Sequence, residues 1–268
     1  MARVCQALAL SRATYDRWRV AQPVFDHNVE RRAQIQAMAL EMPAYGYRRI
    51  TQERHRRGCM VNHKRVLRLR REDNLLCLRV RGLVRTTDSA HDFVVYPHLL
   101  PELTVNGLDQ LWVADIPSVR LQQEFVSLAV LLDAYRRHGI GWALDRYLEA
   151  ELALAALQMA LATRAIRPGL VHHADRGVQY ASQASTNLLK EQGIRISMSR
   201  TGTPDENAQA ESFIKTLKYE EVYWFEYQNL TEARGRIGQF IEEVYNEKRL
   251  HSALGYRPPA EFEQLLDS

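Results

Sequence analysis

Residues 111–144, LWVADIPSVRLQQEFVSLAVLLDAYRRHGIGWAL, decide the fold class of this chain. They contain three apolar segments: LWVADI (111–116), FVSLAVLLDAY (125–135) and HGIGWAL (138–144). Short apolar runs bounded by polar residues are typical of buried strands. The connections between them are short, which favours antiparallel hairpins. We therefore expect three consecutive strands at the start of a sheet.

Helical and strand patterns alternate after this stretch. Helices are predicted over residues 147–165, 181–192, 205–223 and 230–250, and strands over GLVHHA (169–174) and IRISM (194–198). The resulting order, β-β-β-α-β-α-β-α-α, predicts an α/β domain with a mixed, five-stranded sheet.

The composition points to a globular protein of one large or two ordinary domains. The chain has 268 residues, of which 46% are hydrophobic and 25% charged. No apolar run reaches the roughly 18 residues of a membrane span, and we expect neither a membrane segment nor a signal peptide. Three cysteines without a CxxC pair favour a reducing, intracellular compartment.

Positive charge is concentrated in one segment. Residues 45–85 carry thirteen Lys or Arg and three acids, although the net charge of the whole chain is only +4. Two short helices are predicted there, separated at Gly58, with few acids to pair their cations. We expect DNA-phosphate contacts from this segment, and the candidate residues are Arg48, Arg49, Lys64, Arg65, Arg68 and Arg70. A solvated basic face is the alternative.

Two further patterns complete the N-terminal half. Residues 8–18, LALSRATYDRW, suit either a helix-turn-helix with Ser11 as N-cap or a plain helical hairpin, and residues 27–45 form a helical pattern that stops at Pro43. Residues 86–110 mix Pro, Gly, Asp and Thr without periodicity. We therefore expect a basic all-α module over residues 1–85, a linker over 86–108 and an α/β core over 109–268.

Three acids are candidates for chemistry. Asp115 ends the first predicted strand, Asp175 follows the fourth, and Glu211 lies on a helix with Lys215 and Lys218 on the same face. If the two strands are neighbours, both aspartates reach one edge of the sheet. Carboxylates held together repel, and a divalent cation relieves that repulsion. Taken singly, each acid is more simply explained as a cap, a turn residue or a helix ion pair.

The chain resembles the second-frame (OrfB) transposases of the IS-three group of bacterial insertion sequences. The matching stretches run in order along nearly the whole chain: YGYRRI, VNHKRVLRL, LWVADI, LAVLLDAYRRHGIGWAL, HHADRGVQYAS, GIRISMSRTG, NAQAESFIKTLKYE and VYNEKRLHSALGYRPPAEFE. Thirty-five residues separate Asp175 from Glu211, which is the spacing of this DDE family.

The resemblance implies an RNase H-like integrase core preceded by a basic helical module. It further implies that Asp115, Asp175 and Glu211 are the catalytic and metal-binding triad, with two Mg²⁺ or Mn²⁺ ions. Lys218 is then expected to touch transposon-end DNA, with Lys215 beside it, and the segment with Arg249 and His251 closes the core. Expected partners are DNA ends, target DNA, the upstream-frame protein and further copies of the chain, in the nucleoid of a bacterial cytoplasm.

Some positions depart from the family pattern. Pro117 stands where Thr is usual, Ala174 replaces Ser, Asp205 replaces an aromatic residue, and Glu206 replaces Asp. No triad carboxylate is lost. The sequence therefore predicts a metal-dependent DNA strand transferase, with a degenerate DNA-binding regulator or an RNase H-like nuclease as the alternatives.

Overall fold

The computed structural model describes Cys5, Ser11 and residues 13–15, 28–77, 94–200 and 203–266. Residues 13–15 are helical, as expected for the helix that follows Ser11, and the remainder of that predicted helix lies outside the described residues. The predicted N-cap is confirmed, because Ser11 Oγ accepts a hydrogen bond of 3.1 Å from the Thr14 amide.

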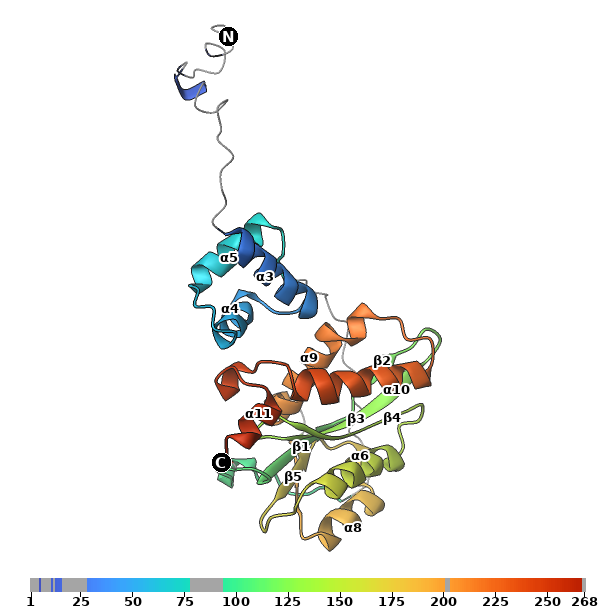
Figure 1. The fold of residues 1–268 in the computed structure, drawn as a ribbon. Helices are drawn as coiled ribbons and strands as arrows, with labels where there is room; N and C mark the ends of the chain where they lie inside the picture. The colour runs from blue at the N-terminus through green and yellow to red at the C-terminus, as the bar shows by residue number, and fades with distance from the viewer. Residues whose placement is uncertain are drawn as a thin grey trace.

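Over the described residues 28–77, three helices form the N-terminal module (Figure 1): α3 (Val29–Glu41), α4 (Tyr47–Arg56) and α5 (His63–Glu72). The breaks between them follow the sequence. Pro43 lies just after α3, and Gly58, with φ of +79°, lies between α4 and α5. Asn62 caps α5 by accepting from the Lys64 amide at 2.8 Å. The helices share a small apolar cluster that includes Ile35, Ile50, Val66 and Leu69.

The core is built on a mixed sheet. Its strands are β1 (Leu111–Asp115), β2 (Ser118–Arg120), β3 (Phe125–Asp133), β4 (Gly139–Asp145), β5 (Val171–Ala174) and β6 (Arg195–Met198). Antiparallel pairs join β4 to β3 and β3 to β1, and parallel pairs join β1 to β5 and β5 to β6. The predicted mixed sheet is confirmed, and the predicted first and fourth strands are neighbours.

One strand was not predicted, and a proline explains it. β2 pairs with β3 in the same register as β1, so the two short strands form one broken strand along β3. The break falls at Pro117, which has no amide hydrogen to donate to the ladder. Its carbonyl still accepts from the Leu128 amide at 3.0 Å. The interruption therefore leaves the register intact.

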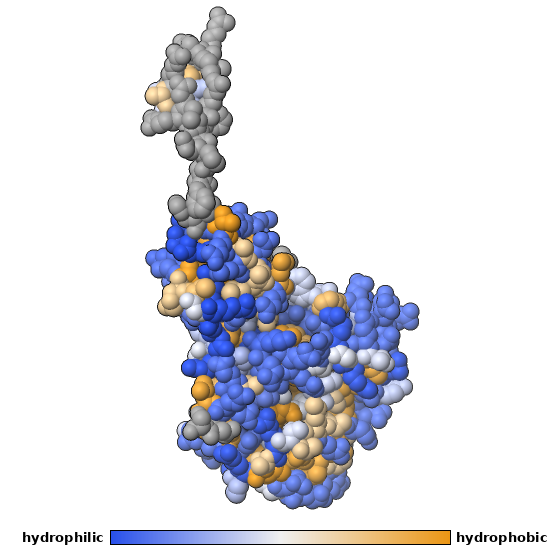
Figure 2. Space-filling model, viewed as in Figure 1, coloured by the Kyte–Doolittle hydropathy of each residue, from blue (hydrophilic) through white to orange (hydrophobic). Residues whose placement is uncertain are grey.

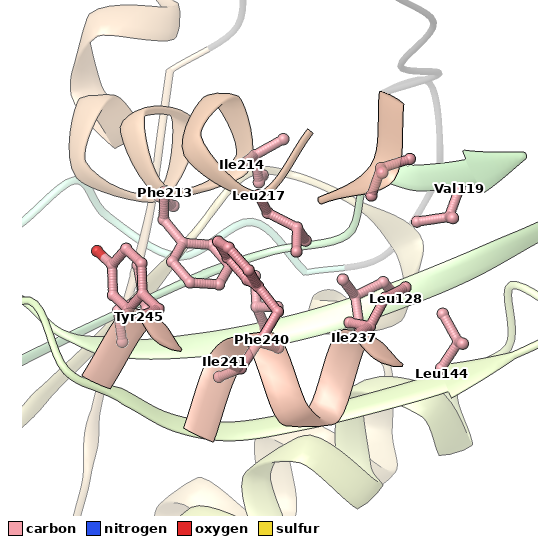
Figure 3. Packing of buried hydrophobic residues seen from close by; sticks show 14 of the residues in the cluster. Val119, Leu128, Leu144, Phe213, Ile214, Leu217, Ile237, Phe240, Ile241 and Tyr245 are labelled. Atoms are coloured by element: carbon pink, nitrogen blue, oxygen red, sulfur yellow. The ribbon is translucent and has the colours of Figure 1, made fainter. Parts of the chain in front are cut away.

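Helices cover both faces of the sheet. On one face lie α6 (Ala150–Thr163), α7 (Val178–Ala181) and α8 (Gln183–Glu191), and on the other lie α9 (Ala208–Glu220), α10 (Leu230–Gln239) and the π-helical turn η4 (Phe240–Asn246). The alternation along β1 explains the layers, because Leu111 and Val113 join one core cluster whereas Trp112 and Ala114 join the other. Figure 3 shows Phe213, Ile214 and Leu217 of α9 packed toward the strands and η4.

Short helical turns complete the chain: η1 (Leu100–Glu102), η2 (Pro204–Asn207), η3 (Val222–Trp224), η5 (Ser252–Leu254) and the last helix, α11 (Pro259–Gln264). Much of the predicted linker is part of the core, because Leu99, Leu100, Leu103 and Val105 pack against its apolar cluster. The Leu99 amide also donates to Ser197 Oγ at 3.0 Å.

A segment near the C-terminus joins the module to the core, and we call residues 248–258 the strap. Leu250 of the strap is buried in the apolar cluster of the module. Tyr45 Oη accepts from the Leu250 amide at 2.7 Å, and Arg49 Nε donates to the Leu250 carbonyl at 3.1 Å. The module and the core are therefore linked through the strap by buried apolar and hydrogen-bonded contacts.

Figure 2 shows mostly hydrophilic residues on the drawn face of both parts.

Candidate functional site

Asp115 and Asp175 lie at one edge of the sheet. β1 and β5 are parallel neighbours, with Leu111 opposite Val171 and Val113 opposite His173. Continuing this register brings position 115 opposite position 175, and paired strands are roughly 4.8 Å apart. Asp115 Oδ1 accepts from the Ile116 amide at 2.8 Å, and Asp175 Oδ1 accepts from the Gly177 amide at 3.0 Å. The strand ends thus hold both carboxylates in defined orientations.

The pKa of Asp115 is affected by Asp175, Glu211 and Lys218. Burial, followed by the Asp175 carboxylate, raises the pKa of Asp115 to about 6; Glu211 acts in the same direction, whereas Lys218 lowers it. Burial in turn lowers the pKa of Lys218, and Asp115 opposes that shift. Three acids and one lysine therefore share one electrostatic environment. Negative charge is crowded here without full compensation, as expected where a cation binds.

Glu211 is engaged elsewhere in this conformation. Its Oε1 lies 3.0 Å from Lys215 Nζ, one helical turn further along α9. Among the described residues, no three His, Cys, Asp or Glu side chains are close enough together to hold a metal ion. To join the aspartates as a ligand, Glu211 must exchange Lys215 for the cation.

Two buried residues beside the acids were not predicted as site residues. Tyr180 is 5% exposed, and burial together with Asp115 and Asp175 raises its pKa well above the usual value. Its hydroxyl has no hydrogen-bond partner among the described atoms. Asn207 Nδ2 donates to the Ala114 carbonyl at 2.9 Å and so ties the start of α9 to the end of β1. In the sequence, only their nearness to Asp175 and Glu211 could have identified them.

The predicted basic residues of the module divide into two sets. Arg48, Lys64, Arg65 and Arg68 are exposed and remain candidates for DNA contact. Arg49 is bound to the strap. The expectation for Arg70 was wrong, because Arg70 is 2% exposed and donates to the Tyr45 and Leu75 carbonyls at 2.6 and 2.7 Å. A guanidinium held this way inside the module cannot reach a phosphate.

The expectation that the module's cations lack acidic partners also needs correction. Arg32 contacts Glu72 and Asp73, Arg57 contacts Glu41 and Glu53, and Arg56 pairs with Glu261 of α11. Glu53 lies one helical turn before Arg57, whereas Glu41 and Glu261 lie outside residues 45–85, so the charge count of that segment does not include them. The predicted DNA contacts that remain exposed are Arg48 of α4 and Lys64, Arg65 and Arg68 of α5, and Arg68 Nε lies 3.5 Å from Glu72 Oε1.

The departures from the family pattern fit this structure. Pro117 keeps the register, and Ala174 is buried in the core. Glu206 accepts from the Arg200 amide and Nε, both at 2.6 Å. Pro117 and Ala174 therefore fit the two strand ends that carry Asp115 and Asp175.

None of the helices within the described residues is long and apolar enough to span a membrane.

Comparison with protein families gives the class. Residues 106–204 and 192–259 match two models of the integrase core domain, and residues 26–82 match a model of an HTH-like domain. The sheet order with helices on both faces is the RNase H-like architecture expected of such a core. The protein is a polynucleotidyl transferase of the integrase-core class with a helical module in front.

Similar proteins give the family. The chain is 34% identical to an uncharacterized 31 kDa protein of insertion element IS600 from Shigella sonnei, over 97% of both chains. It is also 34% identical to transposase InsF of insertion sequence IS3A from Escherichia coli K12, over 82% of this chain and 76% of that one. It belongs to the IS-three group of insertion-sequence transposases.

Solved structures with a similar core include the HTLV-2 integrase catalytic core domain in complex with magnesium. That likeness has 13% identity and a TM-score of 0.44, over 57% of this chain and 95% of the other. The catalytic domain of the Mos1 mariner transposase is similar at 9% identity with a TM-score of 0.43, over 50% of this chain and 71% of that one.

Proposed function

We propose that Asp115, Asp175 and Glu211 are the catalytic triad of this transposase and that they cut and join DNA at insertion-sequence ends. The strand register that brings position 115 of β1 opposite position 175 of β5 is the observation that carries the proposal. The pKa of Asp115 agrees with it, because burial raises that pKa most, Asp175 comes next, and Glu211 acts in the same direction. A structural role for each acid would not require them to converge.

The donor set fits magnesium or manganese. Carboxylate oxygens are the hard ligands that these ions prefer, and the crowded charge favours a cation. Two such ions, when bound, activate the attacking oxygen and stabilise the leaving oxygen of an in-line phosphoryl displacement. Asp115 and Asp175 would hold them from the strand ends, and Glu211 would complete the set from α9.

The lysines of α9 have a matching role. When Glu211 turns toward the aspartates, Lys215 loses its carboxylate partner and becomes available to a DNA phosphate. Lys218 lies close enough to Asp115 to affect its pKa, so a phosphate that it contacts would lie near the reacting atoms. Lys64, Arg65 and Arg68 of α5 would bind the flanking DNA mainly through phosphates.

The reaction would proceed in two steps. Water first attacks a phosphodiester at the insertion-sequence end, which frees a 3′-hydroxyl. That hydroxyl then attacks a phosphodiester of the target, so one bond forms as another breaks, without a covalent bond between protein and DNA. DNA in the bacterial nucleoid, further copies of the chain and the upstream-frame protein are the partners this function requires.

A gel shift and a cleavage assay on the same labelled end DNA, with Mg²⁺ and the upstream-frame protein, test the proposal. Asp175→Asn keeps the size of the side chain and removes one negative charge. We expect binding to persist and cleavage to fall by at least about 100-fold, because the cation site is lost whereas the phosphate contacts remain. Asp145→Asn, at the exposed end of β4, is the matched control and should cleave like the wild type.

Two results would oppose the proposal. Full cleavage by Asp175→Asn would remove that residue from the triad. Binding without any cleavage by the wild type would favour the alternative function, a DNA-binding regulator, and the first reversion to make would then be Pro117→Thr.

A further inference from the structure

A small polar cavity lies where the module, the strap and α9 meet. Its volume is about 110 Å³, well above the roughly 10–15 Å³ that one water needs on this measure. Its main lining side chains are Arg49, Arg137, Arg249, His251, Ser212 and Thr216. Arg49 comes from α4 of the module, Arg137 from the β3–β4 turn, and the two hydroxyls from α9.

The cavity has an excess of positive charge. Glu220 is the only acid that pairs with its arginines among the described residues. Arg249 binds it through Nε and Nη2 at 2.8 and 2.7 Å, whereas Arg49 is 4.0 Å away. Arg137 forms no hydrogen bond or ion pair with the described part of the chain. Three guanidiniums and one carboxylate leave about two positive charges facing the cavity, which suits an anion.

His251 supplies an independent indication of a ligand. It is 5% exposed, its ring contacts Tyr245 edge-on at 4.8 Å, and its Nε2 is buried without a hydrogen-bond partner. Burial and then Arg249, Arg49 and Arg137 lower the pKa of His251 to about 3, so the free protein holds a neutral imidazole. Buried polar atoms normally have a partner. An oxyanion in the cavity would accept a hydrogen bond from this nitrogen.

We propose that the cavity binds one backbone phosphate of the DNA on which the transposase acts. This inference rests on the proposed function and identifies a DNA contact of the same site. Ser212 directly follows Glu211, and successive residues of a helix are turned by roughly 100°. The cavity therefore borders the face of α9 that carries Glu211, Lys215 and Lys218. DNA that follows α9 would place one phosphate near Lys218 and another among the arginines.

A phosphate held there would also connect two parts of the protein. Arg49 belongs to the module, whereas Arg137, Ser212 and Thr216 belong to the core. Bound DNA would strengthen the contact between them, because the same phosphate accepts hydrogen bonds from both.

Arg137→Asn is the most informative variant. Arg137 has a φ of +60°, a region that asparagine adopts more readily than most residues, so the change removes one charge with little strain. Arg167→Asn is the matched control, because Arg167 is exposed at the turn that leads into the start of β5, opposite the aspartate edge. Thermal melting should show that both variants fold like the wild type.

The DNA experiment measures end-DNA affinity over a range of salt concentrations. Arg137→Asn should bind roughly tenfold more weakly, and its log–log salt slope should be smaller by about 0.9, the value for one lost phosphate contact. Arg167→Asn should retain the wild-type slope. Single phosphates of the end DNA can also be replaced, one at a time, by a neutral methylphosphonate. At one position this replacement should weaken DNA binding by the wild type but should not change DNA binding by Arg137→Asn.

Inorganic phosphate separates the possible sources of the anion. In NMR titrations of the full chain, it should shift the His251 ring signals of the wild type and shift them less in Arg137→Asn. Phosphate binding without any effect of Arg137→Asn on DNA would overturn the DNA assignment in favour of a small-anion site. No phosphate shift, with equal DNA binding by both Asn variants, would overturn the cavity proposal altogether. If the wild type binds end DNA yet never cleaves it, the proposed catalysis fails whereas the phosphate site remains supported.

Discussion

Asp115 is the residue whose environment says most about the site. Its pKa is raised by burial and then by Asp175, to about 6 from a usual value near 3.8. Between these two values the folded protein holds a proton that the unfolded chain has already lost. The stability of the metal-free protein therefore falls as pH rises through this window, and it stays lower above pH 6.

Asp115→Asn should remove that penalty. At pH 7.5 without metal, we expect the free energy of unfolding to increase by about 1–2 kcal/mol, after allowance for partial solvent screening. The increase should disappear near pH 4. Mg²⁺ should stabilise the wild type and leave the variant unaffected.

Urea denaturation at the two pH values, with and without Mg²⁺, measures these effects. Glu226→Gln, at an exposed loop acid, is the control and should follow the wild type. A lower stability of Asp115→Asn at pH 7.5 would contradict the view that negative charge is crowded at this edge.

The same residue scale shows what could be predicted. The sequence places Asp115 and Asp175 at the C-terminal ends of two predicted strands. Parallel strands end at the same edge of a sheet, so both aspartates were expected at one edge if these strands were neighbours. The pairing of Glu211 with Lys215 corresponds to the alternative given by their i,i+4 spacing, a helix ion pair. The burial of Arg70 could not be predicted, because it depends on which face of α5 the surrounding chain covers, and the sequence pattern leaves this open.

At the scale of elements, β4 and α6 pack most closely where Gly141 of β4 faces the backbone of α6. A Cβ on Gly141 of β4 would lie 2.2 Å from the Ala156 carbonyl oxygen of α6, so the helix or the strand would have to move. We expect Gly141→Ala to lower the free energy of unfolding by at least about 1–3 kcal/mol.

Gly235 in α10 offers the matched comparison. A Cβ there meets nothing within 4 Å, and the position is exposed. Gly235→Ala should raise stability by about 0.5–1 kcal/mol, because alanine has the higher helix propensity. Chemical denaturation of both variants checks the pair, and equal effects would mean that α6 does not pack this closely on β4.

Element type was predictable, whereas element boundaries were less so. Apolar runs located β1, β3, β4, β5 and β6, but Pro117 concealed β2. Residues 230–250 were expected to form one helix, whereas the structure has α10 followed by η4. Asn246, the last residue of η4, binds the Gly139 amide and carbonyl at 2.9 and 3.0 Å. This tertiary contact fixes the end of the π-helical turn η4. The periodicity of the local sequence gives no sign of it.

At the scale of the whole molecule, the strap determines whether the module and the core act together. Leu250 is 1% exposed and completes the apolar cluster of the module. Leu250→Ala should cost about 2–5 kcal/mol. It should also separate unfolding into two calorimetric transitions, since the module would lose its apolar contact with the core.

Leu189→Ala provides the control for that experiment. Leu189 of α8 is equally buried, but it lies in a core cluster remote from the strap. Its loss should lower the melting temperature by a similar amount without dividing the transition. One shared transition in both variants would indicate that the strap does not couple the two parts.

The position of Leu250 in the chain has a consequence during synthesis. The helices of the module end before residue 77, whereas the leucine that completes their apolar cluster is made about 170 residues later. At roughly 5–20 residues per second, the ribosome would need about 10–30 s to cover that distance. Throughout this interval the nascent module carries its exposed basic helix without the leucine that joins it to the core, and for most of the interval Glu211 has not yet been made. DNA near the site of translation would therefore meet a binding module first and a cutting enzyme only afterwards.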